Sequence, residues 1–171
     1  MIQNFFKNKK ACPQCLKHSF CRRGITALEL IIVVAVIGIL VSITLPQFSK
    51  IKENQVLKNA TGDIVSALHS AQSQTLASVD FSEYGVHFQS DKIIIFKGTV
   101  FLDGDINNKT INIVTPANIS NVTLAGISGT SGDTYFNRLS GVPSKIGTIT
   151  VSTSSASKVI TMSATGAVSI D

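Results

Sequence analysis

The stretch Ile25-Thr-Ala-Leu-Glu-Leu-Ile-Ile-Val-Val-Ala-Val-Ile-Gly-Ile-Leu-Val-Ser-Ile-Thr-Leu45 decides the fold of the first part of the chain. Its 21 residues contain a single charge, Glu29. As a helix with a rise of about 1.5 Å per residue it would be roughly 31 Å long, which matches a hydrocarbon core about 30 Å thick. The sequence therefore predicts a transmembrane helix over residues 25–45.

The residues before this stretch are basic. Residues 1–24 hold six of the fifteen basic residues and no acidic residue, whereas the rest of the chain holds nine basic and ten acidic residues. The net charge of +5 therefore comes from residues 1–24, and the positive-inside rule places them in the cytoplasm and the C-terminal part outside it. Because the body lacks a basic excess, we expect it to bind no nucleic acid.

All three cysteines lie in the basic segment, where Cys12, Cys15, His18 and Cys21 are four potential metal ligands. A Cys-x-x-Cys pair is typical of zinc sites. However, gaps of two residues leave little chain to fold around a tetrahedral ion, and a reducing cytoplasm keeps such thiols free. We expect unliganded cysteines, no metal site and no cofactor.

Residues 46–80 show a different apolar pattern, which predicts an amphipathic extension of the helix. Most of the apolar positions are three or four residues apart: Phe48, Ile51, Val56, Leu57, Ala60, Ile64, Leu68 and Ala71. Pro46 withholds an N–H from the carbonyl of Ser42, so we expect a kink there rather than a helix end. Gly38 is the second expected kink site.

Residues 81–171 predict a β-rich domain, which gives the chain an α+β fold with a long N-terminal helix packed on antiparallel sheet. The expected strands lie at residues 85–89, 92–97, 110–114, 119–124, 147–151 and 158–162. His69 and His87 are expected to be structural, and no Gly-x-Ser-x-Gly or Ser-x-x-Lys motif marks a nucleophile. We therefore expect a protein that is not an enzyme.

Residues 102–108, Leu-Asp-Gly-Asp-Ile-Asn-Asn, place oxygen ligands at alternate positions, as a calcium loop does at its start. The rest of that pattern is missing, because Asn108 stands where glycine is required and Val114 stands where glutamate is required. A loop between strands is the favoured interpretation.

The junction Arg22-Arg-Gly24-Ile25-Thr-Ala-Leu-Glu29-Leu resembles the prepilin cleavage and methylation segment of type IV pilins and type II secretion pseudopilins. A basic leader ends in glycine, an apolar residue follows, an acid stands four residues further on, and a long aliphatic helix begins. The resemblance implies cleavage between Gly24 and Ile25 by prepilin peptidase, N-methylation of Ile25, and pairing of Glu29 with the N-terminal amine of a neighbouring subunit. The family commonly has Phe at the position of Ile25.

A looser resemblance links residues 55–170 to the minor pseudopilins of the GspH/FimT group, in which a long helix leads into a β-domain. Major pilins often carry a C-terminal disulfide, and the absence of cysteine after Cys21 favours a minor subunit. The resemblance implies a single-pass inner-membrane protein that later joins a pilus or pseudopilus. The implied partners are prepilin peptidase, other pilin or pseudopilin subunits, the inner-membrane assembly platform and the lipid bilayer.

Three alternatives remain open. An ordinary secretory signal has a shorter apolar core followed by an Ala-x-Ala-like site, and no such site follows here. A permanently anchored bitopic membrane protein with a ligand- or partner-binding β-domain explains the apolar stretch but needs no acid within it. Glu29 could also serve only as a first-turn acid, which a helix N-terminus favours by about 0.3 to 1 kcal/mol.

Overall fold

The computed structural model describes residues 26–171, apart from the side chains of Leu45 and Pro46. The chain divides into two compact units, residues 1–41 and 42–171. Helix α1 (Ala27–Leu76) contributes to both, and the remaining elements all belong to the second unit. The expected transmembrane segment and its amphipathic extension are thus continuous in secondary structure.

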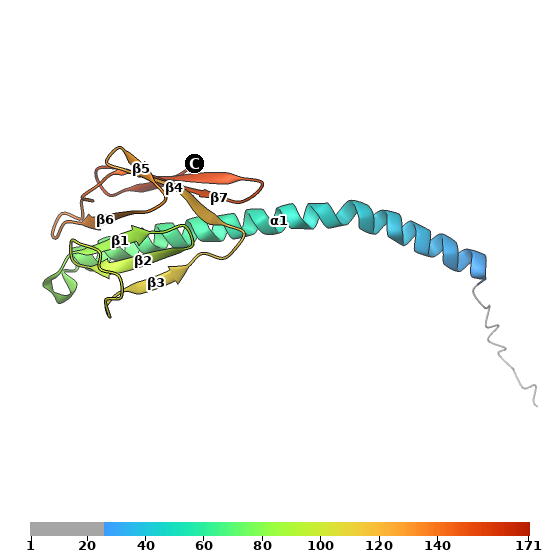
Figure 1. Ribbon diagram of the computed structural model, residues 1–171, viewed down its shortest axis with the longest axis horizontal. Helices are drawn as coiled ribbons and strands as arrows, with labels where there is room; N and C mark the ends of the chain where they lie inside the picture. The colour runs from blue at the N-terminus through green and yellow to red at the C-terminus, as the bar shows by residue number, and fades with distance from the viewer. Residues whose placement is uncertain (1–25) are drawn as a thin grey trace, which may run out of the picture. The chain divides into compact units, whose positions relative to one another are not determined.

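Two antiparallel sheets follow the helix (Figure 1). The first sheet has the strand order β3-β2-β1-β6, and the second has the order β5-β4-β7-β8-β9. The strands are β1 (Tyr84–Phe88), β2 (Lys92–Lys97), β3 (Lys109–Asn112), β4 (Asn118–Leu124), β5 (Ile127–Gly129), β6 (Gly132–Phe136), β7 (Gly147–Ser152), β8 (Ser157–Met162) and β9 (Val168–Ile170). The α+β class expected from the sequence is confirmed.

The core of the second unit forms where α1 packs against both sheets. The helix contributes one apolar stripe, in which alanines at positions 60, 67 and 71 let the strands approach the backbone closely. The fully buried partners include Phe88 and Phe136 of the first sheet and Ile149 and Ile160 of the second. The predicted amphipathic pattern therefore buries its apolar side from Leu57 onward.

A buried hydroxyl joins the end of α1 to the first strand. The Thr75 hydroxyl donates to the carbonyl of Ala71 at 2.9 Å and accepts from the N–H of Tyr84, also at 2.9 Å. The helix ends at Leu76, four residues earlier than expected, because Ser78 adopts the left-handed conformation with φ of 49°. A short 3₁₀ turn, η1 (Val79–Phe81), then leads into β1.

The outer face of the first sheet carries an aromatic cluster. Gly85 and Phe96 are register partners in β1 and β2, and the Phe96 ring lies where a side chain at position 85 would stand. Phe101, from the loop of residues 98–108, stacks on His87 with 3.9 Å between centroids and meets Phe96 edge-on at 5.7 Å. This cluster holds the 98–108 loop against the sheet.

All six expected strands are present, but three strands were not expected: β5, β6 and β9. Strand β6 reads Gly-Asp-Thr-Tyr-Phe and lacks the aliphatic residues that mark the others. Its inward Thr134 is fully buried, and the Thr134 hydroxyl donates to the carbonyl of Lys145 at 3.0 Å. A polar residue can occupy this core position because its hydrogen bond is satisfied.

Candidate functional site

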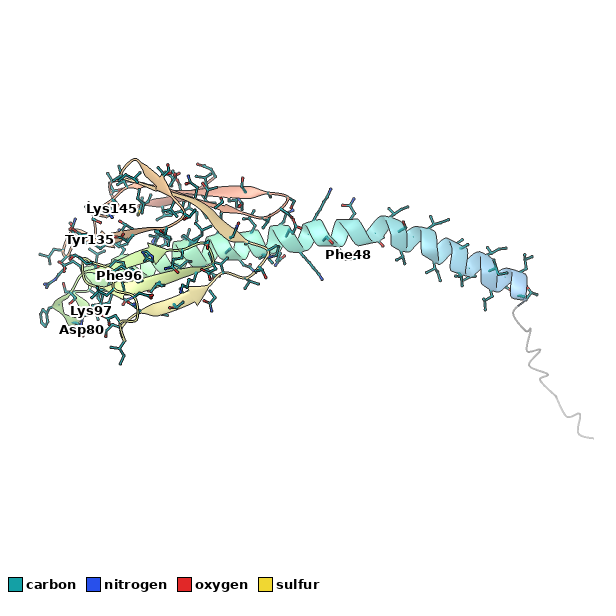
Figure 2. The ribbon with its side chains drawn as sticks, viewed as in Figure 1. Phe48, Asp80, Phe96, Lys97, Tyr135 and Lys145 are labelled. Carbon is teal, nitrogen blue, oxygen red and sulfur yellow. The ribbon has the colours of Figure 1, made fainter. Side chains whose placement is uncertain are left out.

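The first half of α1 is apolar and exposed. Fourteen large apolar side chains between residues 28 and 51 are each 45–69% exposed: Leu28, Leu30, Ile31, Ile32, Val33, Val34, Val36, Ile37, Ile39, Leu40, Val41, Ile43, Phe48 and Ile51. By length and composition the helix is apolar enough to cross a membrane, and its most apolar 18-residue window is 0% buried. Phe48 projects from α1 outside the part that the strands cover (Figure 2).

This surface is costly in water. Burying one large aliphatic side chain stabilises by about 1.5–3 kcal/mol, so fourteen exposed ones need a lipid or protein cover. Unlike the stripe beginning at Leu57, they surround the helix rather than line one side. A helix that is apolar all round is suited to lipid or to a bundle of similar helices.

Thr26 caps this helix. The Thr26 hydroxyl accepts a hydrogen bond from the Glu29 N–H at 3.2 Å, and the Thr26 carbonyl accepts from the Leu30 N–H at 3.1 Å. Thr26 and Glu29 thus stand at the first and last positions of a Thr-x-x-Glu capping sequence. Glu29 is exposed in the first turn of α1, where the helix dipole favours a carboxylate.

The helix runs unbroken through both expected kink sites, Gly38 and Pro46. A Cβ added at Gly38 would meet nothing within 4 Å, so the site has room for a neighbouring backbone to approach closely. A kink at either residue stays a prediction.

Several predicted site residues lie outside the described residues. These are the cleavage and methylation residues Gly24 and Ile25, and the potential metal ligands Cys12, Cys15, His18 and Cys21. Within residues 26–171, no group of three or more His, Cys, Asp or Glu side chains is placed to hold a metal ion.

The 102–108 segment is closed by its own hydrogen bonds. Asp105 Oδ1 accepts from the backbone N–H and the side-chain amide of Asn107, both at 2.8 Å, and the Asn108 amide donates to the Leu102 carbonyl at 2.8 Å. The backbone bond from Asn107 is the main cause that lowers the pKa of Asp105. The segment forms a loop between β2 and β3, as the favoured interpretation expected.

The two histidines of the body differ in environment. His69 is exposed on α1, whereas His87 is partly buried beneath Phe101. Burial lowers the pKa of His87, against the opposing charges of Asp133 and Asp103 and with a smaller contribution from Lys92. The His87 Nδ1 atom is buried and has no hydrogen-bond partner among the described residues.

A groove of about 560 Å³ opens between α1 and the ends of β8 and β9. Leu57 lines it on the helix side, and Ile170 of β9 lines it on the sheet side. Lys58 and Lys158 also line it, together with Asp171. Sequence patterns did not indicate this groove, because it joins positions about a hundred residues apart.

Thr26 was not predicted from the sequence as the helix cap, although Thr-x-x-Glu before an apolar run marks a helix start.

Comparison with protein-family models, with characterised proteins and with solved structures gave no match. The resemblance to pilins therefore rests on the sequence alone, on the junction and helix and on the looser pattern of residues 55–170.

Proposed function

We propose that this chain is a prepilin-like structural subunit, processed by prepilin peptidase and assembled into a type II secretion pseudopilus or type IV pilus-like filament as a minor component. The observation that carries the proposal is the continuous, exposed apolar half of α1 with Glu29 in its first turn. Such a helix is suited to a bilayer and to packing among similar helices. The proposed work is assembly, not catalysis.

The cap at Thr26 supports processing at the preceding residues. Because Thr26 supplies both the hydroxyl and the carbonyl that begin the helix, α1 needs nothing before it to start. Cleavage after Gly24 would remove six positive charges and leave an α-amino group one turn from Glu29. That amine, on a neighbouring subunit, would be the partner of the Glu29 carboxylate in an apolar environment.

The test is the intact mass and N-terminal sequence of the full chain, isolated from membranes of its host with and without prepilin peptidase. A peptidase-dependent start at N-methyl-Ile25 is the expected result. An intact leader in both strains would overturn the proposal. Glu29→Gln should keep the processed mass but reduce recovery of the subunit in sheared filaments, whereas Asp63→Asn, an exposed acid further along α1, should leave recovery unchanged.

A second candidate is a permanently anchored membrane protein whose β-domain binds a ligand or partner. The groove beside Leu57 and Ile170 is the observation that favours it. The same experiment separates the two, because a permanent anchor keeps residues 1–24.

A further inference from the structure

The 98–108 loop is an exposed apolar and acidic projection. Val100, Leu102 and Ile106 are exposed, Ile106 by 97%, although the loop is held in place by Phe101. Between residues 98 and 108 the loop contains Asp103 and Asp105 and no basic residue. Exposed aliphatic side chains on an ordered, anchored loop are suited to insertion into a partner surface.

The groove between α1 and strands β8 and β9 is complementary to the loop in polarity and in charge. Leu57 and Ile170 give it an apolar lining, and Ile170 is left 47% exposed although it is the register partner of the core residue Ile160. Lys58 and Lys158 outnumber Asp171 among the charged lining residues. Its volume of about 560 Å³ would accept a few side chains but not a helix.

The loop and the groove lie at different levels along α1. The loop begins where the Gly98 N–H donates to the Glu83 carbonyl at 2.8 Å, just past the end of α1. The groove ends on α1 at Gly62, fourteen residues before Leu76 and so about 21 Å along the helix. The loop of one copy therefore cannot reach its own groove.

We propose that the 98–108 loop of one copy docks into the groove of the next copy, placing Leu102 and Ile106 against Leu57 and Ile170 and the loop aspartates near Lys58 and Lys158. This inference rests on the proposed function and adds a specific contact between subunits. Two different surfaces meet, so the contact is heterologous and can repeat without closing, as a filament requires. The contact is small, and helix packing in the same assembly would supply the local concentration that it needs.

Cysteine cross-linking of the full chain in membranes tests the contact. Two differently tagged copies carry Ile106→Cys and Asn54→Cys, respectively, with Cys12, Cys15 and Cys21 replaced by serine. Asn54 lines the groove, and the control replaces Ile106→Cys with Ile127→Cys, a comparably apolar exposed position on β5. We expect about tenfold more mixed-tag dimer than in the control, a difference equivalent to ~1.4 kcal/mol. Equal yields of mixed-tag dimer from Ile106→Cys and Ile127→Cys would overturn the inference. So would a product dominated by two copies cross-linked to each other at position 106.

A charge exchange strengthens the test without touching the core. Asp103→Lys places a cation opposite the groove lysines and should reduce the cross-link to the control level, and Lys58→Glu on the other copy should restore it. Both residues are exposed, so folding is unaffected. No effect of Asp103→Lys would contradict the contact.

Failure of this inference is distinguishable from failure of the proposed function. Normal processing at Gly24 and Ile25 without the mixed-tag cross-link would remove the contact and leave the filament proposal. The cross-link in a protein that keeps its leader would support the contact and overturn the processing.

Discussion

The two halves of α1 contain similar apolar residues but differ in how these residues are arranged and whether they are buried. Residues 28–51 present leucine, isoleucine and valine on every side, and the fourteen large apolar side chains that the structure describes there are exposed. Residues 57–71 restrict apolar side chains to one stripe, alternate large residues with alanine, and bury them against two sheets. The first half is suited to an apolar environment that the rest of the folded chain does not provide. The second half is covered by the two sheets of the same chain.

The comparison predicts its largest effect at the centre of the covered stripe. Ile64→Ala removes a fully buried side chain between α1 and the sheets and should lower the free energy of unfolding by about 2–5 kcal/mol. Ile37→Ala, at an exposed position in the first half, should change it by less than about 0.5 kcal/mol. Urea denaturation of the detergent-solubilised full chain, followed by circular dichroism, measures both. Equal effects would break the distinction between the halves.

Membrane insertion, unlike the free energy of unfolding, should be sensitive to substitutions in the first half of α1. Ile37→Lys places a charge near the centre of the apolar segment and should cost about 3 kcal/mol of insertion free energy. Leu28→Lys, near the helix end, should cost clearly less because the side chain can reach the interface. Extraction of membranes with alkaline carbonate measures the retained fraction of each variant. Equal retention of Ile37→Lys and Leu28→Lys would show that position 37 does not lie deeper in the bilayer than position 28.

The end of the covered half depends on one hydroxyl. Thr75→Val keeps the shape but leaves the Tyr84 N–H without its acceptor, and should lower the free energy of unfolding by about 1–3 kcal/mol. Thr110→Val, at an exposed position of β3, is the matched control and should be nearly neutral. The same denaturation measurement applies. A neutral Thr75→Val would mean that the helix end is held by packing alone.

The smallest effect concerns the face of the first sheet that α1 does not cover. Because burial lowers the pKa of His87 below 6.5, the unfolded chain binds more protons than the folded chain just below that value. The contribution of His87 to the free energy of unfolding is therefore fully present above pH 6.5, and it is lost as the pH falls below that value. His87→Phe should flatten the loss of stability between pH 7 and 5, whereas His69→Gln should not. An unchanged slope in His87→Phe would contradict the expected titration.

The sequence predicted the fold where one periodicity dominated. The aliphatic run from Ile25 and the spaced apolar residues from Leu57 predicted the helix, and runs such as Lys92–Lys97 predicted strands. Strand β6 escaped prediction because its core residue Thr134 is polar, and a pattern of residue types cannot show that its hydrogen bond is satisfied. Helix termination at Leu76 depends on the backbone of Ser78, which no apolar pattern reports.

The candidate site was predictable to a similar extent. Glu29 stood out as the single charge in an apolar segment, and the structure places it in the first helical turn. The groove and the aromatic cluster could not be predicted, because both depend on which strands become neighbours. Phe101 lies fourteen residues from His87, and the two rings meet because β1 pairs with β2 and the loop after β2 returns over the sheet.

The aromatic cluster also constrains how the sequence can vary over evolution. A Cβ at position 85 would collide with the Phe96 ring and approach the carbonyl of Thr134. A relative with a side chain at position 85 would therefore need a smaller residue at 96, and the ring at 101 would lose one of its two aromatic neighbours. Positions 85, 96 and 101 should vary together, so that one glycine in a central strand helps to determine the sequence of a loop thirteen or more residues away.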